Sequence, residues 1–235
     1  MKNPIGWWYI SDREFHHILE LVSPMATVNA IRIGPADHGR RMSLEEFREA
    51  EEEEGYRYEL ARGVLEVTYV PGEPHGLIVW TLLRLISAFD IKHPGEIFRA
   101  GGASEFRLWL PAMISGRNPD VAVVLHKTPK DPRGWRPPIL VMEVVSEGTE
   151  AHERDYVTKR EEYLAFGIRE YWIIDPETRC VTVLVRDGDA WVEHRFREEQ
   201  QAKSSILPGL AIRVSDLWVE AEGEDDEGSG DGGQV

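Results

Sequence analysis

The sequence lacks most of the features that mark secreted, membrane-spanning or disulfide-bonded proteins. It holds a single cysteine, Cys180, in 235 residues, which excludes an internal disulfide and a cysteine-rich zinc site. No apolar run approaches the roughly 20 residues that cross a bilayer, and the N-terminus shows no secretory signal pattern. We therefore expect a cytoplasmic protein without a membrane partner.

Positive charge is also scarce. The chain has 27 Lys and Arg against 42 Asp and Glu, a formal net charge of −15, which argues against a general nucleic-acid coat. About half of this charge lies in residues 220–235, a Gly-rich segment with seven acids and no base. Residues 117–136 differ, with a local charge of +3 from Arg117, Lys127, Lys130, Arg133 and Arg136 against Asp120 and Asp131.

Apolar periodicity predicts alternating strands and helices after residue 42. The predicted strands are the hairpin 56–72, turning near 62–63, the segments 96–110, 119–125, 139–146 and 170–177, and the hairpin 180–196, turning at 187–188. The predicted helices are 75–90, apolar almost all round and hence expected to be buried, and 151–167, which Gly167 ends. This order indicates an α/β (α+β) fold in which helices cover a mixed sheet.

We expect the chain to have three regions. Residues 1–42 form an N-terminal extension with a short helix over 11–22, residues 43–219 form one folded domain, and residues 220–235 form a disordered acidic tail. Ser43, followed three residues later by a glutamate, predicts a capping box at the start of a helix.

One carboxylate interrupts an otherwise apolar strand. In "ILVMEVVSEGT", residues 139–149, Glu143 follows four aliphatic or Met residues and precedes two valines. An ionised carboxylate in an apolar interior costs several kcal/mol unless a positive or hydrogen-bonding group meets it. Glu143 therefore needs a partner.

A second acid, Asp120, lies at the entry of the preceding predicted strand. If the two strands are neighbours, Asp120 and Glu143 converge at one edge of the sheet, where their repulsion favours a cation between them. Mg²⁺ typically takes one or two carboxylates and keeps several waters. The sequence predicts a Mg²⁺ (or Mn²⁺) site formed by Asp120, Glu143 and the backbone carbonyl of Val144.

A lysine on the helix after Glu143 completes the predicted site. Tyr156, Lys159 and Tyr163 are spaced i, i+3 and i+7, on one face of an α-helix. We expect this face to point inward, where the Lys159 ammonium can stabilise negative charge that develops on a phosphate. Asp155, one turn earlier, is placed to orient the lysine.

These motifs resemble the Uma family of restriction-endonuclease-like proteins, in the PD-(D/E)xK nuclease superfamily. The resemblance runs from Ser43 to Trp218 and is carried by residues 56–67, 74–86, 118–124, 139–149 and 155–175. It implies a restriction-endonuclease-like central mixed sheet flanked by helices, with a C-terminal β-hairpin, and a metal-dependent phosphodiesterase site. Asp120 matches the acid of the PD element, and Glu143 matches the acid of the ExK element.

The chain departs from the superfamily pattern at one position. Two residues after Glu143 stands Val145 instead of lysine. In the family that the sequence resembles, the lysine is found on the following helix, where this chain has Lys159. Glu59 and His75 match further positions of the family pattern and are secondary catalytic candidates; alternatively, Glu59 is an exposed strand residue and His75 only starts a helix.

The leading hypothesis is a Mg²⁺-dependent endonuclease acting on nucleic acid, with DNA as the expected substrate. The basic segment 117–136 is expected to contact backbone phosphates, and a homodimer would supply two sites for two strands. Simpler explanations remain for each residue: Glu143 paired with an arginine, Asp120 as a turn acid, and Lys159 paired only with Asp155. The alternative functions are an inactive nuclease-like binding module and an interaction protein whose acidic tail mimics nucleic acid.

Overall fold

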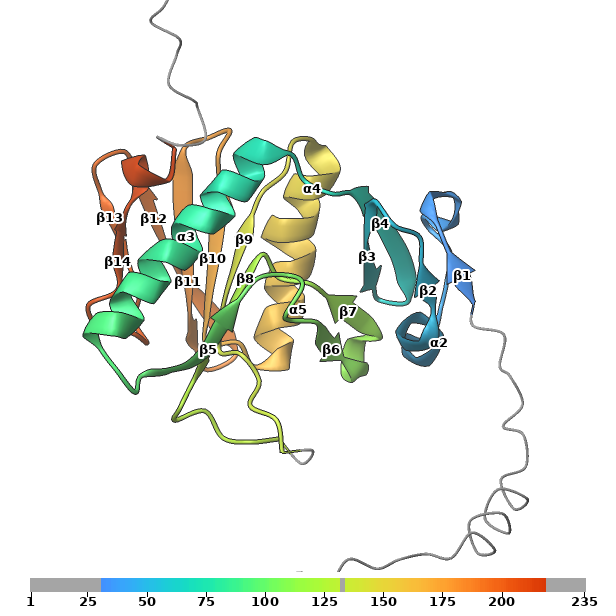
Figure 1. The fold of residues 1–235 in the computed structure, drawn as a ribbon, viewed down its shortest axis with the longest axis horizontal. Coiled ribbons are helices and arrows are strands. Elements are labelled where there is room, and N and C mark those ends of the chain that lie inside the picture. The colour runs from blue at the N-terminus through green and yellow to red at the C-terminus, as the bar shows by residue number, and fades with distance from the viewer. Residues whose placement is uncertain (1–30, 132–133, 219–235) are drawn as a thin grey trace, which may run out of the picture.

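The computed structural model describes residues 31–131 and 134–218. The predicted helix over 11–22 and the predicted acidic tail lie outside these residues. The described part consists of a six-stranded sheet with helices on both faces and a smaller four-stranded sheet beside it (Figure 1).

The central sheet has the strand order β12-β11-β10-β9-β8-β5. Its strands are β5 (Ile97–Gly101), β8 (Val121–Leu125), β9 (Leu140–Val144), β10 (Glu170–Asp175), β11 (Cys180–Asp187) and β12 (Ala190–Arg197). β9 and β10 are parallel, and the other neighbouring pairs are antiparallel. The predicted mixed sheet and C-terminal hairpin, β11–β12, are therefore confirmed.

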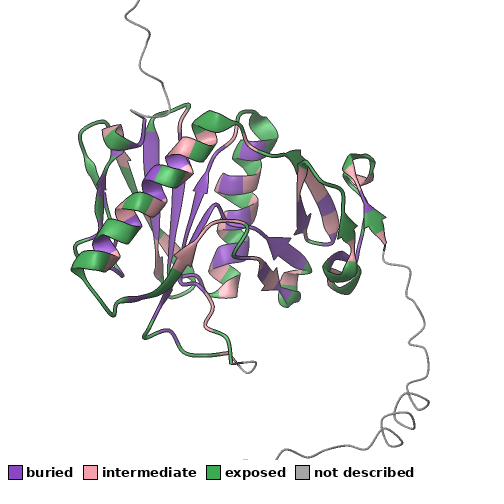
Figure 2. Cartoon of the chain, viewed as in Figure 1, coloured by how far each residue is buried: buried purple, intermediate pink, exposed green. Residues whose placement is uncertain are grey.

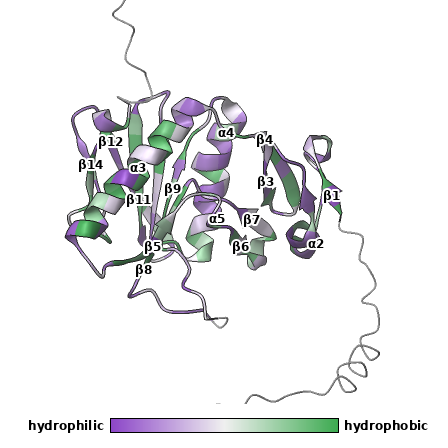
Figure 3. Ribbon diagram, in the orientation of Figure 1, coloured by the Kyte–Doolittle hydropathy of each residue, from purple (hydrophilic) through white to green (hydrophobic). Residues whose placement is uncertain are grey.

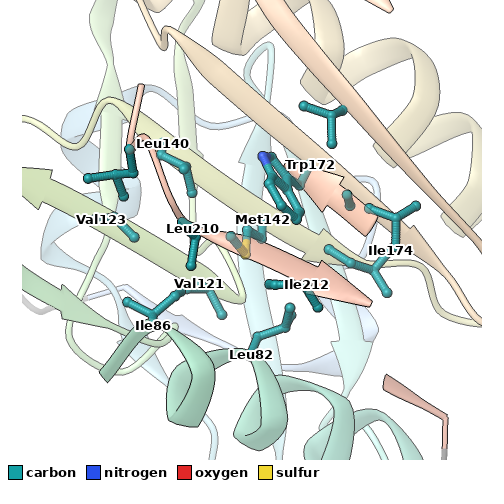
Figure 4. Close-up of a cluster of buried hydrophobic side chains, with 14 of the residues drawn as sticks. Leu82, Ile86, Val121, Val123, Leu140, Met142, Trp172, Ile174, Leu210 and Ile212 are labelled. Carbon is teal, nitrogen blue, oxygen red and sulfur yellow. The ribbon is translucent and has the colours of Figure 1, made fainter. Parts of the chain in front are cut away.

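Alternate residues of the central strands enter two separate cores, because successive side chains of a strand point to opposite faces. On one face, α3 (Glu73–Lys92) and the small hairpin β13 (Gln201–Lys203) and β14 (Ala211–Arg213) cover the sheet. Figure 4 shows the side chains that meet there: Leu82, Ile86, Val121, Val123, Leu140, Met142, Trp172, Ile174, Leu210 and Ile212. The middle strands are buried along their whole length (Figure 2).

Helix α3 is buried on one face only, so the prediction of a fully buried helix is wrong. Ile78 and Leu82 pack on the sheet, whereas Trp80 is 57% exposed and Ile91 is 80% exposed. Among the described residues, α3 alone is long and apolar enough to cross a membrane by length and composition. Its inner face contributes to the sheet's core, which is the position of a core helix.

The opposite face of the sheet is covered by one long helical segment. It consists of α4 (Thr149–Glu153), a π-helical turn (Arg154–Thr158) and α5 (Lys159–Phe166). Gly167 ends the segment in the left-handed region, at φ 103°, as the sequence predicts. Figure 3 shows that much of this segment is hydrophilic, although it lies against the sheet.

The smaller sheet has the order β4-β3-β7-β6, formed by β3 (Tyr56–Ala61), β4 (Val64–Tyr69), β6 (Leu108–Leu110) and β7 (Ser115–Arg117). The β3–β4 hairpin turns at residues 62–63, as predicted. Helix α2 (Leu44–Glu49) starts with the predicted capping box. β1 (Arg32–Ile33), from the predicted extension, pairs with β2 (Glu51–Glu52), and Ile33 is buried in the core of the smaller sheet.

Candidate active site

Asp120 and Glu143 lie beside each other because their strands are neighbours. Val121 pairs with Met142 in the antiparallel β8–β9 ladder, which places the two acids opposite each other at its end. The Asp120 Oδ2 accepts a 2.9 Å hydrogen bond from the Val144 N–H. The two acids on adjacent strands are therefore brought together.

Asp120 is held by two further elements. From β3, Arg57 Nη1 donates to Asp120 Oδ1 at 2.9 Å, and from the first turn of α3, His75 Nε2 lies 3.2 Å from Oδ2. His75 was predicted from the sequence as a site residue, whereas Arg57 was not. The signal for it was its position two residues before Glu59, on the same face of the strand.

The partners of Glu143 come from α5. The Tyr163 hydroxyl donates to Glu143 Oε1 at 2.5 Å, and Lys159 Nζ lies 3.0 Å from Oε2. Glu143 is only 1% exposed. These two contacts offset part of the free-energy cost of removing its carboxylate from water. Tyr163 was expected on the inward face of the helix, but its role in the site was not predicted.

Lys159 is surrounded by three carboxylates. Besides Glu143, its Nζ lies 3.3 Å from Asp155 Oδ1 and 3.5 Å from Glu59 Oε2. The inward row on the helical segment is thus Asp155, Lys159 and Tyr163, at spacings of four. The predicted row began instead with Tyr156. In the structure Tyr156 is partly buried and its hydroxyl donates to Asp175, because the residues from Arg154 to Thr158 form a wider π turn.

All five predicted catalytic residues line a single cleft of about 1150 Å³. The residues that line the cleft come mainly from the first turn of α3, the ends of β8 and β9, the helical segment α4–α5, the β3–β4 hairpin and the β10–β11 turn. Nine acidic side chains and four Arg or Lys side chains line it. The cleft therefore has an excess of negative charge.

Burial and neighbouring charges move the pKa values of the three carboxylates in different directions. The pKa of Glu143 is raised to about 8, mainly by burial. The charge of Lys159 opposes this rise, and the charges of Asp120, Asp155 and Glu59 contribute to it. Burial also opposes ionisation of Asp120, but His75 and Arg57 hold its pKa below the usual range. For Glu59, the charges of Lys159 and Arg117 outweigh burial and lower the pKa to about 2.

These residues are chemically suited to a hard divalent cation. Among the described residues no group of three or more His, Cys, Asp or Glu side chains forms a metal cluster, but Mg²⁺ needs only one or two carboxylates plus waters. Each Glu143 oxygen contacts a single side chain, which leaves a lone pair for a cation. The raised pKa of Glu143 reflects its burial and the neighbouring carboxylates, and a bound cation would favour its ionised form. The Val144 carbonyl as a third ligand stays a prediction.

The described basic side chains of residues 117–136 do not line the cleft. Lys127 and Lys130 are exposed in the loop between β8 and β9, at the opposite end of these strands from the two acids (Figure 1). Arg117 is completely buried, and its Nε donates to Glu162 at 2.7 Å. The expectation that this segment contacts phosphates beside the site is therefore wrong for Arg117. The loop with Lys127 and Lys130 lies at the other end of the strands, so its position does not support the expectation either.

Comparisons with known proteins agree with this fold. Residues 44–215 match the model of the Uma2 family, described as "Putative restriction endonuclease". Among solved structures, that of a putative nuclease belonging to DUF820 from Anabaena variabilis matches with a TM-score of 0.60 at 21% identity, covering 77% of this chain and 99% of that chain. No curated protein shows a significant match. Because the family match spans more than half of the chain, the protein belongs to the Uma2 family, as the motifs predicted.

Proposed function

We propose that the protein is a Mg²⁺-dependent endonuclease that hydrolyses the phosphodiester bonds of DNA. The observation that carries the proposal is the meeting of Asp120, Glu143 and Lys159, from three separate elements, in one cleft. The description of the Uma2 family as restriction endonucleases supports nuclease activity and favours DNA as the substrate.

Each residue has a distinct role in the proposed site. Asp120 and Glu143 would hold the cation, which would supply positive charge to polarise a phosphate oxygen and a water molecule. The Lys159 ammonium stabilises the negative charge that builds up on the phosphate. Tyr163 orients the Glu143 carboxylate through its hydroxyl hydrogen bond.

Arg57 and His75 act on Asp120. Because both contact its carboxylate, they keep it ionised and fix its rotamer while it faces the cleft. The excess negative charge of the cleft repels a DNA backbone, and a cation held by Asp120 and Glu143 would reduce this repulsion. Binding of DNA is therefore expected to depend on Mg²⁺.

The test is nicking of supercoiled plasmid in the presence of Mg²⁺ or Mn²⁺. We expect the wild type to cut, EDTA to stop cutting, and Glu143→Gln to lose at least about 100-fold in rate. Equal cutting by wild type and Glu143→Gln would exclude this site. An RNA substrate of the same length, assayed in parallel, tests the choice of DNA.

A second candidate is a nuclease-like module that binds nucleic acid or protein without cutting. It is favoured by the three carboxylate contacts of Lys159, which occupy the ammonium in the absence of substrate. Calorimetry with Mg²⁺ separates the two functions. An endonuclease needs metal binding that Glu143→Gln abolishes, whereas a binding module need show none.

A further inference from the structure

Arg117 lies at the centre of a second charged cluster, directly behind the proposed site. Its side chain is 0% exposed, and its Nε donates to Glu162 Oε2 at 2.7 Å. Its Nη1 donates to Glu66 Oε2 at 2.5 Å and to Glu59 Oε2 at 3.1 Å. One guanidinium thus joins α5 to both strands of the β3–β4 hairpin.

The two charged clusters share one carboxylate, Glu59. Its Oε2 lies between Arg117 Nη1 at 3.1 Å and Lys159 Nζ at 3.5 Å, and its Oε1 accepts the N–H of Asn118 at 2.7 Å. Lys159 is 3.0 Å from Glu143, closer than it is to Glu59. Because Arg117 compensates much of the charge of Glu59, the ammonium stays with Glu143.

The position of Arg117 is maintained at an energetic cost. Its Nη2 is buried and has no hydrogen-bond partner in the described structure, and a buried donor without a partner is destabilising. A lysine could not replace the arginine, because a single ammonium cannot donate in two fixed directions to Glu162 and Glu59. Such a costly arrangement is expected where function requires it.

We propose that Arg117 is a positioning residue: it fixes Glu59 and compensates its charge, so that the Lys159 ammonium stays against Glu143. The kinetic consequence rests on the proposed nuclease function, whereas the positioning of the ammonium does not. When residue 117 no longer contacts both Glu162 and Glu59, Glu59 attracts the Lys159 ammonium away from Glu143. The ammonium is then out of reach of the phosphate.

The first experiment follows the Lys159 ammonium by NMR of protein labelled with ¹⁵N at lysine Nζ, without metal or substrate. The Lys159 signal is assigned by its loss in Lys159→Gln. We expect Arg117→Lys and Glu59→Gln to shift or broaden this signal. Glu66→Gln, which removes a carboxylate that contacts Arg117 but not Lys159, is the matched control and leaves the signal in place.

The second experiment measures DNA cleavage at saturating Mg²⁺. We expect Arg117→Lys to lower kcat by about 10- to 100-fold with KM changed less than about threefold, because small misplacements of a catalytic group are costly. In a Lys159→Gln background the same substitution lowers kcat less than about twofold, since a residue that acts through Lys159 has nothing left to position.

The outcomes separate this inference from the proposed function. An unchanged Lys159 signal in folded Arg117→Lys, or an equal loss of kcat in both backgrounds, overturns the positioning role. If Arg117→Lys does not fold by circular dichroism, Glu59→Gln decides by the same NMR signal. A wild type that cuts no nucleic acid ends the proposed function, while the NMR comparison still decides the positioning.

Discussion

Strands β8 and β9 treat charge in opposite ways at their two ends. At one end, Asp120 and Glu143 are buried and every charge has a partner. At the other end, Lys127 and Lys130 are exposed, and Trp135 is 65% exposed beside them in the chain. Both ends are polar in the sequence, and only the first is built as a site. The two ends differ because the charges at the first end are buried and paired. Burying charges costs stability, so such an arrangement is expected mainly at functional sites.

The largest effect is expected from removing one charge at the buried end. Asp120→Asn keeps the size of the side chain but removes a ligand charge, and we expect kcat for DNA cleavage to fall by about 100- to 1000-fold. Glu96→Gln, an exposed acid near the other end, is the control and should stay within about twofold of wild type. Similar losses in both variants would mean that the two ends do not differ in function.

Stability should follow the same contrast. Lys159→Gln leaves Glu143 and its neighbours without their buried cation, and we expect the free energy of unfolding to fall by about 3–5 kcal/mol. Lys130→Gln changes an exposed side chain and should stay within about 0.5 kcal/mol. Urea unfolding of both variants at neutral pH gives the two values. If the two variants unfold at the same urea concentration, the expected difference in stability between the two ends is contradicted.

Metal binding should depend on pH through Glu143. Burial raises its pKa to about 8, so below that pH the folded protein holds a proton that a cation must displace. We expect Mn²⁺ affinity to rise about tenfold per unit between pH 6 and 8, with release of about one proton. Calorimetry in two buffers of different ionisation enthalpy measures this proton.

The same shift has a consequence for stability without metal. Since the folded pKa of Glu143 lies above its ordinary 4.5, the folded state binds more protons than the unfolded state between these values. The contribution of Glu143 to the free energy of unfolding therefore falls as the pH rises from 4.5 to about 8. Glu143→Gln should remove this loss of stability, measured by urea unfolding at several pH values without metal. A loss that survives the substitution would assign the proton to another group.

The smallest effect is expected at the exposed end. Each phosphate contact by Lys or Arg adds about 0.9 to the slope of log affinity against log salt. Because the loop lies away from the cleft, we expect the double substitution of Lys127 and Lys130 by Gln to leave this slope unchanged. Fluorescence anisotropy with labelled DNA, Mg²⁺ and the inactive Asp120→Asn protein measures it. A decrease of one or two would place the loop in contact with DNA.

Local patterns in the sequence were sufficient to predict much of the fold and the candidate site. The apolar strand around Glu143, the strand entered at Asp120 and the helix that ends at Gly167 all follow from short-range signals. Their juxtaposition at one cleft follows because neighbouring antiparallel strands bring the start of one beside the end of the other.

The environment of Arg117 could not be predicted in this way. Its carboxylate partners lie 45 to 58 residues away in the chain, so its segment reads as part of a basic loop. Likewise, nothing in the spacing of Tyr156 and Lys159 indicates the π turn over Arg154–Thr158, in which Asp155 is buried beside Lys159. Such features depend on tertiary contacts, which periodicity does not encode.

The wide separation of the site residues along the chain has a consequence for the cell. Glu59 and Tyr163 are a hundred residues apart, and the proposed site needs both together with the strands between them. A nascent chain still emerging from the ribosome, or a proteolytic fragment of the first half, contains only isolated acids. Any nuclease activity would thus arise only after the second half of the domain has been synthesised. Incomplete chains would then not cleave nearby nucleic acid.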